Sequence, residues 1–154
     1  MKLKNILFVV NDIEKSKAFY KDFFGLQIVA DFGENVILTE GLVLQEKKLW
    51  EKSIEKDVIA GGNNAELYFE ENNLDKFLEK LEKSTQPIEY LNKCIERDWG
   101  QRVIRIYDPD KHIIEIGESM DYVARRLLKD GMSVEQVAKK TQLPLSQIQI
   151  IAQI

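Results

Sequence analysis

The chain has 154 residues, of which 44% are hydrophobic and 31% are charged, and its formal net charge at pH 7 is −4. This length suits one domain of ordinary size or two small halves that share a core, and the charged fraction suits a globular surface in water. The negative charge argues against nucleic acid as a partner, and no stretch approaches the roughly 20 apolar residues that a membrane-spanning helix needs.

Two features of the sequence predict a cytoplasmic location. The apolar run that ends at Val10 is followed by Asn11-Asp12 and by no small-residue cleavage site, so it makes a poor secretory signal. The single cysteine, Cys94, has no partner in the chain for a disulfide, which fits a reducing compartment. The sequence around it fixes no basic partner that would lower its pKa, so we expect an inert thiol.

The first half of the chain predicts the element order β-α-β-β-β. Apolar side chains recur at helical spacing between Asp12, a plausible N-cap, and Gly25, a typical stop, and predict a helix there. Runs rich in β-branched residues, separated by turns, predict strands over 4–10, 26–32, 36–39 and 42–45. The charged segment 47–63 predicts a connection with a short helical piece around 49–54.

The same order of elements then starts again. The predicted elements are a strand over 65–70, a helix over 74–81 and strands over 88–95, 101–106 and 113–117. We therefore expect a structural repeat with modules at 1–46 and 64–118. The two halves match in element order and not in residues.

From residue 119 onward the pattern becomes helical. Ser119 and Ser133 are predicted to cap two helices, and a final segment follows Pro144. The part from Asp130 resembles the first helices of a helix-turn-helix, but residues 145–154 contain no Lys or Arg, which a DNA-reading helix needs. We therefore interpret 119–154 as a helical extension that packs on the protein or makes dimer contacts.

Two motifs at opposite ends of residues 2–118 resemble the vicinal-oxygen-chelate superfamily, which holds glyoxalase I, bleomycin- and fosfomycin-resistance proteins and extradiol dioxygenases. They are VNDIEKSKAFYKDFFGLQIV, residues 10–29, and WGQRVIRIYDPDKHIIEIGE, residues 99–118. The resemblance implies an α+β fold in which two βαβββ modules form a partly open barrel around a cavity. It also implies a small-molecule ligand in that cavity and an intertwined homodimer.

In active members of the superfamily the cavity holds a divalent metal ion, and the resemblance gives the ligand positions. The first falls on Asn5, where metal-binding relatives usually have His; the equivalent in the second module falls on Glu66, and the closing position on Glu115. Two carboxylates and an amide suit magnesium or manganese better than zinc, nickel or iron, which favour imidazole. The only histidine, His112, replaces none of these ligands, and Lys111 stands where many relatives have glycine.

Strand alternation bears on the two carboxylates independently. Glu66 and Glu115 each lie on the strand face opposite aliphatic neighbours. If the aliphatic faces pack on helices, both carboxylates face the cavity and are candidate catalytic residues, as general base or metal ligands. The alternative is that these faces meet water.

Other polar and aromatic side chains are expected around the cavity. The candidate ligand-binding residues are Gln45, Trp50, Asn64, Tyr68, Trp99, Gln101 and Arg105. Trp99 lies between charged residues and a glycine, so it is a candidate to stack on a flat ligand, with simple packing as the alternative. Arg105 either binds an anionic group or pairs with Glu66 or Glu115.

Three functions therefore remain open. The first is a lyase, isomerase or dioxygenase of the superfamily type that uses Glu115 and Glu66. The second is a non-catalytic protein that sequesters a small cationic or aromatic compound. The third is a ligand-sensing regulator whose extension contacts DNA, although its last helix lacks the basic residues for that role.

Overall fold

A computed structural model describes residues 1–153, which fall into two compact units. Unit 1 consists of Met1–Glu66 and Tyr107–Ile113, and unit 2 of Leu67–Ile106 and Ile114–Ile154. The segment 107–113 is the turn between two strands of the second half of the chain, yet its contacts lie mainly with the first half.

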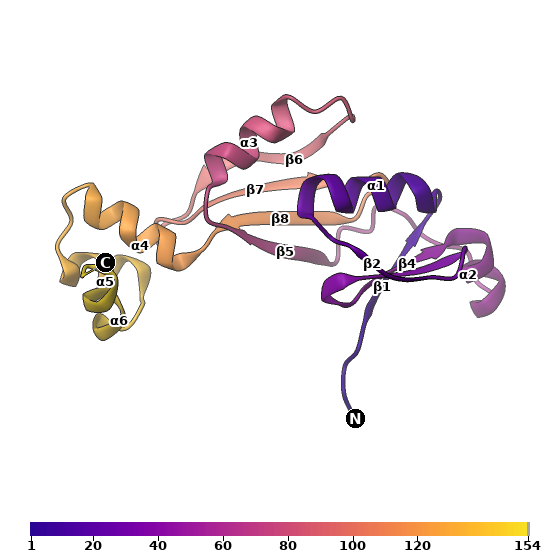
Figure 1. Ribbon diagram of the computed structural model, residues 1–154, viewed down its shortest axis with the longest axis horizontal. Coiled ribbons are helices and arrows are strands. Elements are labelled where there is room, and N and C mark those ends of the chain that lie inside the picture. The colour runs from indigo at the N-terminus through magenta and orange to yellow at the C-terminus, as the bar shows by residue number, and fades with distance from the viewer. Residues whose placement is uncertain (154) are drawn as a thin grey trace. The chain divides into compact units, whose positions relative to one another are not determined.

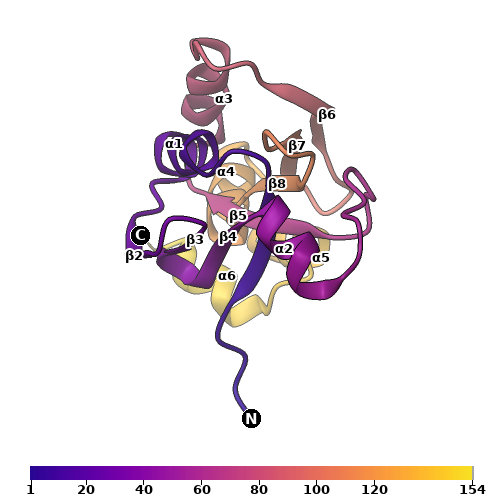
Figure 2. The same cartoon turned by 90° about the vertical axis from the view of Figure 1, so that its right-hand side faces the viewer.

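Unit 1 contains one four-stranded sheet and two helices (Figure 1). Its elements are β1 (Ile6–Val10), α1 (Ile13–Phe24), β2 (Ile28–Asp31), β3 (Asn35–Leu38), the 3₁₀ turn η1 (Thr39–Gly41), β4 (Leu42–Glu46) and α2 (Lys47–Ile54). The strand order is β1-β4-β3-β2, with β1 parallel to β4 and the other neighbours antiparallel. Helix α1 lies over one face of this sheet, as Figures 1 and 2 show together.

Helix α1 begins and ends where the sequence predicts. The Asp12 side chain accepts a hydrogen bond from the backbone N–H of Lys15 at 3.0 Å, which satisfies one of the free N–H groups of the first turn. Gly25 ends the helix with a φ of 70°, and its N–H donates to the carbonyl of Lys21. Phe19 and Phe23 are buried on the face of α1 that is turned toward the sheet.

Unit 2 repeats the arrangement. Its elements are β5 (Glu66–Glu71), α3 (Leu74–Glu82), β6 (Glu89–Glu96), β7 (Arg102–Tyr107) and β8 (Ile113–Glu118). The strand order β5-β8-β7-β6 is that of the first sheet with every strand number raised by four. The predicted α+β fold of two βαβββ modules is therefore confirmed.

The contacts of α3 identify the two faces of the second sheet. Asp75 of α3 pairs with Arg102 of β7, and Leu78 lines the same pocket as Ile104, so even-numbered residues of β7 face α3. Because strand side chains alternate, Arg105 faces away from the helix. Its ion-pair partner Glu115 lies on the same side of the sheet, the face opposite α3, as the alternation predicted.

Residues 119–153 form three helices. They are α4 (Met120–Lys129), α5 (Val134–Thr141) and α6 (Leu145–Ile151). Ser119 and Ser133 cap the first two as predicted, the second with a full capping box to Gln136. The three helices share a small apolar core formed by Val123, Ala124, Leu127, Val137, Ile148 and Ile151.

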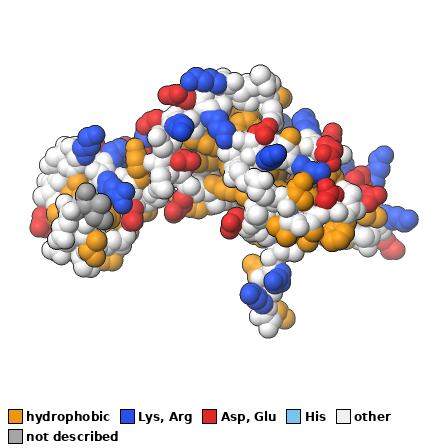
Figure 3. Space-filling view, in the orientation of Figure 1, with side chains coloured by type: hydrophobic (Ala, Val, Ile, Leu, Met, Phe, Trp, Pro, Cys, Tyr) orange, Lys and Arg blue, Asp and Glu red, His pale blue; other side chains and the backbone are white. Residues whose placement is uncertain are grey.

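The surface is mixed in charge, with one apolar edge. Acidic and basic side chains are interspersed over the face seen in Figure 3. Strand β2 is one of the two outer strands of its sheet, and Ile28, Val29 and the following Phe32 are exposed there. No helix within residues 1–153 combines the length and the apolarity needed to span a membrane.

Candidate functional site

Two of the predicted site residues form an ion pair on the face of the second sheet opposite α3. The Arg105 guanidinium contacts the Glu115 carboxylate, and the two side chains are 21% and 12% exposed. Of the two roles considered for Arg105, the structure has the ion pair with Glu115. A proton or a metal ion that approaches this carboxylate has to compete with the arginine for its oxygens.

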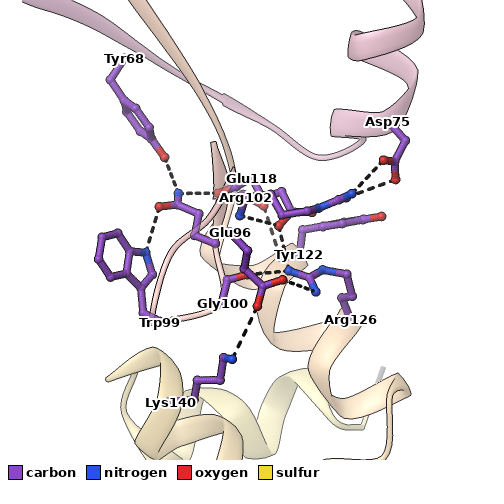
Figure 4. Close-up of polar contacts among 12 residues, drawn as sticks. Tyr68, Asp75, Glu96, Trp99, Gly100, Arg102, Glu118, Tyr122, Arg126 and Lys140 are labelled. Carbon is purple, nitrogen blue, oxygen red and sulfur yellow. Dashed lines mark hydrogen bonds and ion pairs between the residues drawn. The ribbon is translucent and has the colours of Figure 1, made fainter. Parts of the chain in front are cut away.

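Three more predicted residues form a hydrogen-bonded row at the end of the same sheet (Figure 4). The indole N–H of Trp99 donates to the side-chain oxygen of Gln101 at 3.0 Å. The Gln101 amide nitrogen donates to the Tyr68 hydroxyl at 2.9 Å and to the carbonyl of Glu118 at 2.7 Å. Gln101 therefore fixes both aromatic side chains.

The two aromatic rings of this row keep exposed surface. Tyr68 and Trp99 are 46% and 41% exposed, which leaves ring faces for a ligand. Partial burial raises the pKa of the Tyr68 phenol, so the hydroxyl stays protonated at neutral pH. Gly117 makes room for the row, because a β-carbon there would lie 2.9 Å from the Gln101 amide nitrogen and 3.1 Å from the Tyr68 hydroxyl.

A buried carboxylate that the sequence analysis did not single out lies beneath the row. Glu118 is fully buried and accepts hydrogen bonds from Arg102 Nε at 2.7 Å, from the Arg102 backbone N–H at 3.0 Å and from Arg126 at 3.1 Å. Hydrogen bonds to Asp75 and Glu118 raise the pKa of Arg102. The signal in the sequence is a second carboxylate at the end of a strand that is apolar except for Glu115, because a buried carboxylate requires a cation partner.

The helical extension holds the loop that carries Trp99 and Gln101. Arg126 of α4 donates to the carbonyl of Gly100, between the two residues. Gly100 has a φ of +90°, and a β-carbon there would lie 3.0 Å from Lys140 Cε and 3.2 Å from Leu127 Cδ1. The extension therefore packs directly against this loop, as Figure 4 shows.

The remaining predicted ligand-binding residues belong to unit 1. Gln45 is buried. Its side-chain oxygen accepts a hydrogen bond from Asn35 at 2.8 Å, and its side-chain nitrogen donates to the carbonyl of Glu34 at 3.0 Å. Its amide group therefore stabilises the pairing of β3 and β4. Trp50 is half-buried in α2, and Asn64 is exposed at the end of the connection. Their role toward a ligand stays a prediction.

The residues at the predicted metal positions do not fit a metal centre of the superfamily type. Within residues 1–153 no three His, Cys, Asp or Glu side chains are grouped to hold a metal ion. Glu115 has a guanidinium on its carboxylate, and this positive charge opposes a divalent cation at the same oxygens. Asn5 and Glu66 are exposed residues of unit 1, and an amide is a weak replacement for imidazole.

The two modules and the polar face of the second sheet define a protein of the vicinal-oxygen-chelate type. Residues 3–121 match the family model described as a glyoxalase-like domain, and the chain belongs to this family. The match ends at the start of α4, so most of the helical extension lies outside it.

Comparisons with individual proteins are consistent with this family assignment. YraH of Bacillus subtilis (strain 168) is 32% identical over 133 residues, which cover 75% of this chain and 97% of YraH. A crystal structure of a protein of unknown function from Agrobacterium tumefaciens C58 is 37% identical, with a TM-score of 0.65, covering 77% of this chain and 94% of that one. The fold also matches FosX, a fosfomycin resistance protein of Listeria monocytogenes, at 18% identity and a TM-score of 0.60, covering 77% of this chain and 93% of FosX.

Proposed function

We propose that this protein binds a small, flat organic compound on the face of the β5-β8-β7-β6 sheet opposite α3 and holds it without chemical change. The single observation that carries the proposal is the ion pair between Arg105 and Glu115. A general base or a metal ligand needs a carboxylate whose oxygens are open to the reacting group. A pre-formed ion pair is instead suited to orienting a polar group of a ligand.

The hydrogen-bonded row supports the class of ligand. Trp99 and Tyr68 present half-exposed rings, and Gln101 holds both by hydrogen bonds. Fixed aromatic faces favour a flat ligand, because stacking then costs little side-chain entropy. The likeness to FosX, described as a fosfomycin resistance protein, is in keeping with a small-molecule role.

The experiment uses Trp99 as the reporter in a Trp50→Phe background. Benzamidine, benzoate and benzamide are titrated as flat probes that are cationic, anionic and neutral. We expect saturable quenching by at least one probe. We expect Arg105→Gln to weaken the binding of benzoate about tenfold, because a charge-assisted hydrogen bond is lost. Arg125→Gln, which removes an exposed arginine of α4, is the matched control and should leave the affinity unchanged.

The competing function is a lyase or isomerase of the superfamily type. Proton exchange into the bound compound in D₂O, or a change in its mass after incubation, would establish turnover and contradict the proposal. Quenching that never saturates with any of the three probes would contradict ligand binding at this face. So would quenching of the wild type that is unchanged when Trp99→Phe leaves Trp50 as the only tryptophan.

A further inference from the structure

A separate cavity lies wholly within unit 1. Of the predicted site residues only Asn64 lines it, and the proposed function uses none of its lining residues. Its volume is about 250 Å³. It is enclosed by the end of β1, the first turn of α2, the connection 58–65 and the turn 110–113. Its polar lining residues include Lys47, Lys111 and His112, the only histidine of the chain.

The imidazole of His112 is held firmly at this cavity. Its ring stacks on Phe8 with centroids 4.1 Å apart and planes 11° apart. Its Nδ1 lies 2.9 Å from the Asp108 carboxylate, which is buried. Since Asp108 is placed to accept a hydrogen bond from Nδ1–H, Nε2 is the nitrogen left for a ligand, and it donates to an oxyanion when the ring carries both protons.

The charge around the cavity favours an anion. The Lys47 ammonium is 3.8 Å from the Glu51 carboxylate, longer than a hydrogen bond, so it keeps donors for a ligand. The Lys111 ammonium lies 5.6 Å from the ring centre of Tyr107. The one carboxylate in the lining, Asp110, already accepts hydrogen bonds from the backbone and side chain of Asn11.

The connection over the cavity is fixed by a hydrogen bond. The Tyr107 hydroxyl donates to the side-chain oxygen of Asn63 at 2.8 Å. This bond leaves the amide nitrogen of Asn63, a donor, at a residue that lines the cavity. Donors and cations thus converge from three segments that are far apart in the sequence.

We propose that this cavity binds a small oxyanion, a carboxylate or a phosphate group, through Lys47, Lys111 and His112. Lysines act on such groups as point charges, and an imidazole ring that carries both protons donates from Nδ1 to the carboxylate and from Nε2 to the oxyanion. The proposal is independent of the ligand on the second sheet, because it concerns other residues in another unit.

The single histidine makes the test direct. The Cε1–H signal of His112 is followed by NMR at fixed pH and ionic strength while sodium phosphate or sodium acetate replaces sodium chloride. We expect a saturable shift. We expect Lys47→Gln and Lys111→Gln each to weaken binding about tenfold, whereas Lys48→Gln, an exposed lysine next to Lys47 that does not line the cavity, leaves it unchanged.

The two salts distinguish a phosphate ligand from a carboxylate ligand. Saturation with phosphate alone assigns a phosphate ligand, saturation with acetate alone a carboxylate, and saturation with both an oxyanion of either kind. A shift that stays linear for both salts, or one that survives both cavity-lining lysine substitutions, would overturn the proposal.

Discussion

Lys111 has a φ of +69°, in the left-handed region that glycine adopts without strain, and it stands where the family resemblance expects glycine. We expect Lys111→Gly to raise the free energy of unfolding by about 0.5 to 1 kcal/mol relative to Lys111→Ala. Both variants lose the lysine side chain, and only the alanine variant keeps a β-carbon. Urea unfolding of the two variants measures the difference, and equal midpoints would show that the turn is not strained.

The same substitution separates stability from binding. If Lys111 holds an anion, Lys111→Gly gives a more stable protein that binds phosphate more weakly. The family glycine would then be the better residue for the turn, and the lysine would be retained for its charge.

Single residues also show how far the sequence could be read. The ion pair of Arg105 and Glu115 was one of the alternatives for Arg105, because alternation places both side chains on one face of neighbouring strands. The hydrogen bond between Gln101 and Tyr68 joins residues that are 33 positions apart in the sequence, and a local sequence pattern does not predict such a contact. His112 was set aside although Asp108 precedes it by four residues across a turn, a spacing that lets the carboxylate reach the ring.

At the scale of elements, Gly100 is the point at which the helical extension meets the second sheet. We expect Gly100→Ala to lower the free energy of unfolding by about 2 to 4 kcal/mol, because a β-carbon is strained at this φ and collides with α4 and α5. Gly131→Ala is the matched control, since Gly131 has a φ of +92° and nothing within 4 Å of its β-carbon position. Thermal unfolding of the two variants tests the difference. Equal losses of stability in the two variants would mean that the close packing of Gly100 against α4 and α5 contributes nothing.

The order of the strands and helices was predictable from the sequence, but the contacts that hold the helical extension against the second sheet were not. Each strand and helix has a local signal, such as the Asp12 cap and the Gly25 stop of α1, so the βαβββ repeat follows from the sequence. The position of the extension depends on Glu118, which draws Arg102 and Arg126 together from different elements. Such a buried charge cluster is set by tertiary packing, which alternation and capping do not encode.

For the molecule as a whole we predict a homodimer that covers the apolar edge at β2. Phe32 is 68% exposed beside Val29, and a second copy would remove this surface from water. We expect the wild type to sediment as a dimer and Phe32→Lys as a monomer. Ile150→Lys, at a side chain of α6 that is 62% exposed, should stay dimeric. A monomeric wild type would contradict the prediction, and dissociation by Ile150→Lys alone would place the interface on the extension.

The Asp-Pro-Asp turn has a consequence for the order of folding during synthesis. The buried Tyr20 hydroxyl donates to Asp108 at 2.8 Å, and the backbone N–H of Asn11 donates to Asp110 at 2.9 Å, across 88 and 99 residues. A nascent chain that ends before residue 107 lacks both acceptors, so burying this hydroxyl would leave a polar group unpaired. The N-terminal unit therefore cannot finish folding on the ribosome until nearly all strands of the other unit have been made.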